Sequence, residues 1–307
     1  MSGALRQPLA DYLAVRRALG YKLARPEKLL GQFISYLDQA GAVTVTTRHA
    51  LAWAVLPGGD PSWHAYRLAV VRGFATWLRT IDEDTEIPAA KLIPSRKPRA
   101  TPYLYADAEI TALISAAASL RFPLRTATYQ TLIGLLAVTG IRVGEAIALN
   151  RGDADLGAGV LTIRESKHGK SRLVPVHEST IEALRGYLRV RDRLCPDART
   201  PAVLISPAGT RLLYCNVHAT WKKLAVAAGL KPRSAAYRPR IHDLRHSFAV
   251  RSLLDAYESG LDGQATLSVL ATYLGHTDPG HTYWYLSASP ELMAAAGQRL
   301  EAWLERP

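Results

Sequence analysis

The chain has 307 residues, of which 48% are hydrophobic and 21% charged, a globular composition that excludes a disordered or fibrous protein. This length allows two domains, each with its own core. The longest apolar run, residues 132–138, is far too short to span a membrane, and the N-terminus does not read as a signal peptide. We therefore expect no membrane partner and a cytoplasmic location. Two cysteines, Cys195 and Cys215, fit neither a disulfide framework nor a zinc-binding spacing.

The charge balance points to a polyanionic partner. The net charge is +12, from 38 Lys and Arg against 26 Asp and Glu, and both halves of the chain are basic. Such a balance favours nucleic acid, and we expect double-stranded DNA. A basic surface that serves only solubility is the competing interpretation.

Residues 1–90 predict a small helical bundle. Apolar side chains recur at three- and four-residue steps over 4–20, after Pro26, from Thr46 or Thr47 to Trp53, and after Ser62. Arginines punctuate the fourth of these helices, and we expect Arg67 and Arg72 to contact a DNA backbone from exposed positions. A plain bundle with solvated arginines is the alternative.

Residues 91–103 are predicted to be a linker. The stretch 88–102 contains four prolines and no acidic residue, so it is expected to be extended and basic. Arg96, Lys97 and Arg99 would lie against phosphates. A basic linker between two basic domains favours a clamp around a duplex.

Residues 104–307 predict a mainly helical domain with a small antiparallel β-sheet. The period changes to two in VLTIRES and RLVPV, which flank the turn KHGKS and so favour a hairpin. The window from Ala198 to His242 has no acidic residue, and helix 216–228 with Trp221 is its expected DNA-contacting element. The contacts expected there are Lys222, Lys223, Arg238 and Arg240. Residues 290–305 predict an amphipathic helix.

Six further residues carry the chemistry. Arg142 lies in TGIRVGE, His242 and Arg245 lie in HDLRH, His276 follows a Leu-Gly step, Tyr285 follows nine positions later, and Lys167 lies in the hairpin. Guanidinium groups neutralise the negative charge that develops when a phosphodiester is attacked. A phenol with a pKa of about 10 becomes a nucleophile when a neighbouring base or positive charge helps it to lose its proton. The set predicts attack on a phosphodiester by a tyrosine, with a lysine to protonate the leaving oxygen.

These motifs resemble those of the tyrosine recombinase (phage integrase) family over about residues 104–286, and more loosely the N-terminal bundle and linker. The resemblance implies a core-binding domain followed by a catalytic domain. It implies that Arg142 and Arg245 bind the scissile phosphate, that His276 donates a hydrogen bond to it, and that Lys167 is the general acid. His242 would assist proton transfer at Tyr285, which would form a 3′-phosphotyrosine link, and Glu145 would support the site.

Two departures from the family pattern concern geometry. The loop around DAYESGLDGQA looks longer than is usual, and Pro279 follows the LGH motif. Both leave open whether Tyr285 acts within its own subunit or in a neighbour.

Several residues have competing interpretations. Tyr283 and Tyr273 are rivals of Tyr285, although packing is the commoner role of such aromatics, and Lys170 is a rival of Lys167. The pair His242 and His246 has a zinc-like spacing, but Asp243 stands where a metalloprotease has glutamate and no distal ligand is evident. The sequence HGKS lacks the glycine of a phosphate-binding loop, because Arg164 stands there.

The sequence therefore predicts a site-specific DNA recombinase or integrase of a mobile element that needs no metal, cofactor or ATP. Two duplexes require four active sites, so a homo-tetramer on synapsed DNA is expected, with partner recombinases or accessory factors as a possibility left open. Topoisomerase-like relaxation and a non-catalytic DNA-binding accessory protein are the alternatives.

Overall fold

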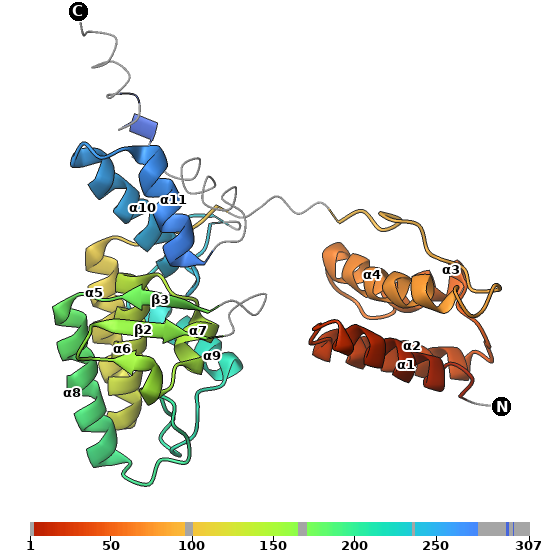
Figure 1. Ribbon diagram of the computed structural model, residues 1–307, viewed down its shortest axis with the longest axis horizontal. Coiled ribbons are helices and arrows are strands. Elements are labelled where there is room, and N and C mark those ends of the chain that lie inside the picture. Colours follow the sequence, from red (N-terminus) through yellow and green to blue (C-terminus); the bar gives the residue numbers. More distant parts are fainter. Residues whose placement is uncertain are drawn as a thin grey trace, which may run out of the picture. The chain divides into compact units, whose positions relative to one another are not determined.

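The computed structural model describes residues 3–95, 101–164, 171–234, 237–275, 293–294 and 297. The chain divides into two compact units, Met1–Arg99 and Ala100–Pro307 (Figure 1). Part of the expected linker, with Arg96, Lys97 and Arg99, lies outside the described residues, as do Lys167, His276 and Tyr285. Among the described residues, no helix is both long and apolar enough to cross a membrane.

The N-terminal unit is a four-helix bundle, as the sequence predicts. Its helices are α1 (Arg6–Ala18), α2 (Ala24–Gln39), α3 (Thr47–Val55) and α4 (Pro61–Leu78). Phe33, Ile34 and Phe74 are almost fully buried between the helices. Thr46 caps α3 by accepting a hydrogen bond from the His49 amide, and Asp60, not Ser62, caps α4. Proline follows that cap because the first helical position needs no amide hydrogen.

The exposed position predicted for Arg67 is wrong, because its side chain is buried. The residue is only 6% exposed, because its guanidinium packs 3.6 Å from the Trp53 ring and donates a 2.7 Å hydrogen bond to the Trp53 carbonyl. Arg72, one and a half turns further along α4, is partly exposed. Helical periodicity identifies the face of a residue, but it does not reveal that an arginine has a carbonyl and an aromatic ring as internal partners.

Substitution of Arg67 by methionine should destabilise the N-terminal unit without weakening DNA binding. We expect the free energy of unfolding to fall by about 1–2 kcal/mol, because the Trp53 carbonyl loses a charged hydrogen-bond donor and the Trp53 ring loses its cation. Arg72→Met is the matched variant, with unchanged stability and a salt dependence of DNA binding that is reduced by about one phosphate contact. Urea unfolding and binding titrations at several salt concentrations test both. Weakened DNA binding by a stably folded Arg67→Met protein would contradict the structural role.

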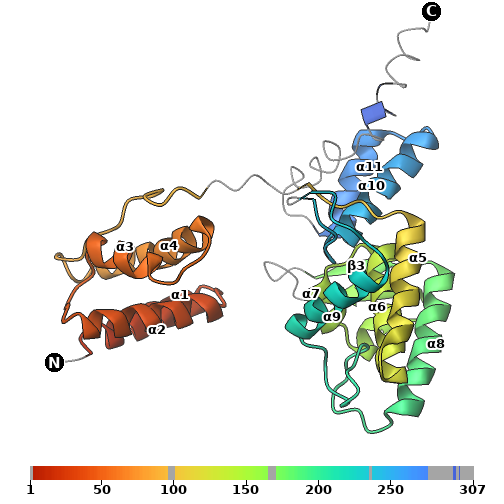
Figure 2. The same ribbon diagram turned by 180° about the vertical axis from the view of Figure 1, so that it is seen from behind.

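The second unit is built around helix α6 (Pro123–Thr139). This helix packs against α5 (Asp107–Ala116), α8 (Glu178–Leu194) and α10 (Asp243–Glu258) (Figure 2). The unit also contains α7 (Val143–Ala148), α9 (Tyr214–Ala227) and the short 3₁₀ helices η1 (Ala117–Ser119) and η2 (Arg151–Asp153). Leu132, Ile133 and Leu136 of α6 are at most 1% exposed. Helix α6 is apolar on most sides because several neighbouring helices cover it, although Val138 near its end is 52% exposed.

A three-stranded antiparallel sheet packs on this core, as predicted. Its strands are β1 (Ala154–Asp155), β2 (Val160–Ile163) and β3 (Arg172–Pro175), in the order β1-β2-β3. The register pairs Ile163 with Arg172 and Leu161 with Val174. Leu161 and Val174 are buried. The period-two pattern therefore predicted the two strands correctly. Arg172 is the first residue of β3 and belongs to the strand pair nearest the turn.

The segment that was expected to be a long loop is mostly helical. Helix α10 continues to Glu258, and α11 (Gly263–Leu274) begins after four residues. Gly260, with φ 73°, ends the turn after α10, and Asp262 caps α11 by accepting hydrogen bonds from the amides of Gln264 and Ala265. Leu253, Leu267 and other apolar side chains hold the two helices together. The short turn fixes where the C-terminal end of α11 lies.

Candidate active site

A tight turn places Arg142 at the start of α7. Helix α6 ends at Gly140 with φ 59°, a left-handed conformation that glycine adopts without strain. A Cβ atom at this position would collide with the Phe248 ring. Two residues later, Arg142 is the extended N-cap of α7, and a quarter of its side-chain surface is exposed. The sequence TGIR thus directs a partly exposed guanidinium to the end of α6.

Glu145 is the carboxylate that binds the two arginines near this turn, Arg142 and Arg172. It accepts hydrogen bonds from the Arg142 amide and from Nη1 of Arg142, both at 2.8 Å. It also accepts two from Arg172, at 3.0 and 2.9 Å. Burial alone would raise the pKa of Glu145, but the hydrogen bonds and charges of Arg172 and Arg142 outweigh it and lower the pKa to about 2. Glu145 is therefore ionised at every physiological pH.

Arg172 is the residue that the sequence analysis did not single out. Its side chain is 11% exposed, and its Nε donates a 2.7 Å hydrogen bond to the Tyr273 carbonyl in α11. The only signal in the sequence is a basic residue at the first position of an otherwise apolar strand, RLVPV. A strand-end arginine is commonly solvated, so this signal was weak.

Arg245 lies one turn into α10 and is 2% exposed. Its Nη1 donates to the Gly140 carbonyl at 2.8 Å, and its Nη2 donates to the Leu274 carbonyl at 2.6 Å. These carbonyls end α6 and α11, where helices leave acceptors without intrahelical partners. Arg142 reaches the same place, because its Nη2 lies 3.4 Å from the Gly275 carbonyl. Two guanidinium groups thus meet where α6, α7 and α11 come together.

His242 stands at the N-terminal end of α10, beside these arginines. Burial of the ring among protein atoms and the positive charges of Arg245 and Arg142 lower the pKa of His242 to about 4. The residue as a whole keeps an exposed surface, and water there screens part of this effect. The direction still makes the imidazole neutral at pH 7, so that it is able to accept a proton.

His246 is oriented differently. It is 9% exposed, and its ring lies edge-on to that of His242 with the centroids 5.3 Å apart. Its Nε2 is 4.0 Å from a carboxylate oxygen of the buried Asp243. These contacts support an internal role for His246. In the described part of the chain, no group of three His, Cys, Asp or Glu residues is arranged to hold a metal ion.

Tyr273 packs inside the fold. Its ring stacks on Phe248 with centroids 5.6 Å apart, and burial raises the pKa of Tyr273 to about 12. A phenol that resists ionisation is a poor nucleophile. This rival of Tyr285 is therefore a packing residue in the structure.

Comparison with known proteins identifies the family of the chain. The Phage integrase family matches residues 104–291. "Putative integrase/recombinase y4rB" of Sinorhizobium fredii is 43% identical over 98% of both chains, and tyrosine recombinase XerD of Bradyrhizobium diazoefficiens is 29% identical over 96% of this chain and 95% of its own. The chain belongs to the phage integrase family.

The structure of XerH site-specific recombinase, bound to palindromic difH substrate in a post-cleavage complex, has the same fold. It superposes with a TM-score of 0.62 at 19% identity, and the match covers 91% of this chain and 78% of XerH. The fold class that the sequence predicts is thereby confirmed. The chain is a tyrosine recombinase, a site-specific DNA recombination enzyme.

The described residues that were predicted to contact DNA differ in how exposed they are. Lys222, Lys223 and Arg238 are exposed, whereas Arg240 is paired with Asp243 through its Nε and Nη2. Trp221 is 2% exposed, so its predicted place on the DNA-contacting surface is wrong. Trp221 belongs to the apolar core of this unit, where its ring lies edge-on to that of Tyr105 with the centroids 6.0 Å apart.

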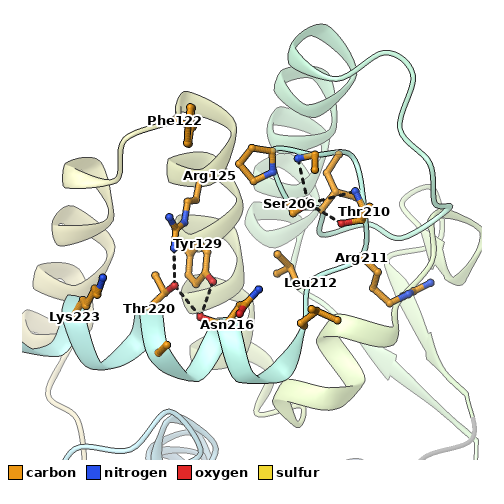
Figure 3. Close-up of a pocket in the computed structure, with 15 residues that line it drawn as sticks. Phe122, Arg125, Tyr129, Ser206, Thr210, Arg211, Leu212, Asn216, Thr220 and Lys223 are labelled. Atoms are coloured by element: carbon orange, nitrogen blue, oxygen red, sulfur yellow. Dashed lines mark hydrogen bonds between the residues drawn. The ribbon is translucent and has the colours of Figure 1, made fainter.

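A hollow between α6 and α9 is separate from the cluster of arginines. Figure 3 shows Arg125 donating to Thr220, and Tyr129 to the Asn216 carbonyl, on the facing sides of the two helices. Arg125 and Tyr129 belong to the first half of α6, whereas Arg142 follows the C-terminal end of that helix. Since α6 has 17 residues, its ends are about 25 Å apart. The hollow is therefore not part of the candidate active site.

Proposed function

We propose that this recombinase cleaves and rejoins DNA through a covalent 3′-phosphotyrosine at Tyr285, without a metal ion or a nucleotide. The observation that carries the proposal is the convergence of Arg142, Arg245 and His242 beside Gly275. Arg142 lies 100 residues before His242 in the sequence, and Gly275 lies 133 residues after Arg142. Gly275 directly precedes His276, so the LGH motif begins at this cluster.

The chemistry follows from the charges. Arg142 and Arg245 would stabilise the non-bridging oxygens of the scissile phosphate as negative charge develops there. Tyr285 forms the new P–O bond and loses its proton to the neutral His242. The P–O5′ bond breaks, and Lys167 protonates the leaving 5′-oxygen, while His276 donates a hydrogen bond to the phosphate. Because the phosphotyrosine retains the energy of the phosphodiester, rejoining needs no ATP.

Residues 1–90, the linker 91–103 and residues 104–307 would form a clamp on double-stranded DNA. The exposed Lys222, Lys223 and Arg238 and the partly exposed Arg72 are candidate phosphate contacts. The basic linker residues Arg96, Lys97 and Arg99 would extend this surface along the duplex. Integration or transposition of a mobile element is the process we infer, as for the related integrases.

A multimer on DNA is the corresponding assembly. A palindromic substrate such as that bound by XerH presents two half-sites related by a two-fold axis, one for each protomer. Exchange between two duplexes cuts four strands, and each cut uses one tyrosine. We therefore propose a tetramer on two synapsed sites, with residues 290–305 as the contact between neighbours.

A strand-exchange assay tests this function. Supercoiled plasmids that carry DNA from both sides of the gene are incubated with the protein in EDTA, beside plasmids that lack this DNA. We expect recombinant junctions only with the flanking DNA. Relaxation of both plasmids without exchange would favour the topoisomerase-like alternative, and salt-sensitive binding without cleavage of nicked or intact sites would favour the non-catalytic binder.

A further inference from the structure

We propose that Arg172 is a positioning residue for strand cleavage, which holds the phosphate-binding Arg142 in place through Glu145 and ties both to the C-terminal end of α11. The inference rests on the proposed function, because it assigns a task to the same site. Arg172 would not touch the DNA. Its effect would pass through the carboxylate that it shares with Arg142.

The first support is geometry. Arg172 donates from Nη1 and Nη2 to the two carboxylate oxygens of Glu145, at 3.0 and 2.9 Å. Arg142 donates from Nη1 to one of the same oxygens at 2.8 Å. One carboxylate thus lies between two guanidinium groups. Paired arginine–carboxylate hydrogen bonds fix orientation as well as distance, so the angle at which Glu145 meets Arg142 depends on Arg172.

The second support is the link to α11. The third donor of Arg172, Nε, binds the Tyr273 carbonyl at 2.7 Å. Gly275 adopts φ 68°, and a Cβ atom there would lie 3.0 Å from Nη1 of Arg172. The positive φ favours glycine at this position, and the backbone passes close to the guanidinium. Arg172 thus ties the C-terminal end of α11 to Glu145 and Arg142. Gly275, which follows this end, directly precedes His276.

The third support is charge. Glu145 is faced by Arg142 at the start of its own helix, by Arg172 from β3 and by His242 from α10. With one positive partner, the negative carboxylate would neutralise Arg142 and weaken its attraction for a phosphate. With the second positive charge of Arg172, the cluster of Arg142, Glu145 and Arg172 retains a net positive charge that attracts the phosphate. Lysine cannot replace the arginine fully, because it offers one compact ammonium instead of three directed donors.

The experiment compares single-turnover rates of covalent adduct formation on nicked duplexes, for wild type, Arg172→Gln, Arg172→Lys, Glu145→Gln and the double variant Arg172→Gln/Glu145→Gln. Each duplex is made with an ordinary phosphodiester and with a neutral methylphosphonate at the cleaved position. Arg164→Gln is the matched control, because Arg164 pairs with Asp153 at the end of the neighbouring strand and does not contact Glu145.

We expect Arg172→Gln to slow cleavage of the phosphodiester by about 100-fold, as for the loss of one charge-stabilising donor, and cleavage of the methylphosphonate by less than about 3-fold. Without its charge on the substrate oxygen, the reaction no longer needs a well-placed Arg142. Arg172→Lys should lose about 10-fold. The double variant should be no slower than the slower single variant, because both act through one carboxylate. Arg164→Gln should stay within about 3-fold of wild type.

A pH profile gives a second readout. Wild-type Glu145 has its pKa lowered to about 2 and stays charged down to acidic pH. Loss of Arg172 removes the largest stabilising partner of that charge, so its pKa rises, and the buried carboxyl takes up a proton as pH falls. Activity of Arg172→Gln should therefore fall at a higher pH than activity of wild type does.

Equal losses on both substrates, or additive losses in the double variant, would overturn the inference. If Arg172→Gln does not fold, as judged by circular dichroism, Arg172→Lys decides: a rate equal to wild type on the phosphodiester would overturn the proposal. Absence of adduct with wild-type protein on either duplex would instead count against the proposed function.

Discussion

Substitution of Tyr285 by phenylalanine should abolish the covalent protein–DNA adduct. The variant keeps the aromatic ring and removes only the hydroxyl that would attack phosphorus, so folding and DNA binding should be retained. We expect at least a 10³-fold loss of adduct, about the cost of removing a nucleophile. The measurement is an SDS-resistant adduct in EDTA on nicked duplexes from DNA flanking the gene.

Two further tyrosines serve as controls for this experiment. Tyr273→Phe should retain adduct formation, because burial raises the pKa of Tyr273 to about 12 and its ring packs on Phe248. Tyr283→Phe should also react, since the spacing from His276 selects Tyr285. An adduct formed by Tyr285→Phe and lost in Tyr283→Phe would move the nucleophile to Tyr283.

The second large effect is expected for Arg142→Ala. Removal of one preorganised donor from a developing oxyanion slows catalysis by about 10²–10³-fold, and we expect that loss in the rate of strand cleavage. Affinity for intact DNA should change far less, because many basic residues share the binding. Single-turnover adduct formation and binding titrations at one salt concentration separate the two quantities.

Arg151→Ala is the matched control for Arg142→Ala. Arg151 is an arginine of the same unit that pairs with Asp192, and both side chains are about half exposed, so its loss should leave cleavage unchanged. Arg142→Lys should recover only part of the rate, because lysine cannot contact a phosphate oxygen and Glu145 with one rigid group. A parallel loss of binding and cleavage in Arg142→Ala would indicate a general DNA contact instead.

Local sequence patterns determined the secondary structure and much of the site. The helical period of α1 to α4, the glycine that ends α6 and the alternation in β2 and β3 are properties of neighbouring residues, which the chain encodes directly. The motifs around Arg142, Glu145, His242 and Arg245 also identified residues that meet in space. Their meeting could be expected from the family resemblance alone, because they are separated by about 100 residues.

The tertiary structure decided which side chains are available. Arg67, and Trp221 in the helix predicted to contact DNA, were expected on surfaces that face DNA, yet both side chains are buried. Arg172 was overlooked for the opposite reason: a strand-end arginine is usually solvated, but the fold places Glu145 and the Tyr273 carbonyl within reach of its three donors. Periodicity specifies the face of an element that a residue occupies. The partner on that face depends on how distant elements pack, and this packing sets the charge and orientation of the site.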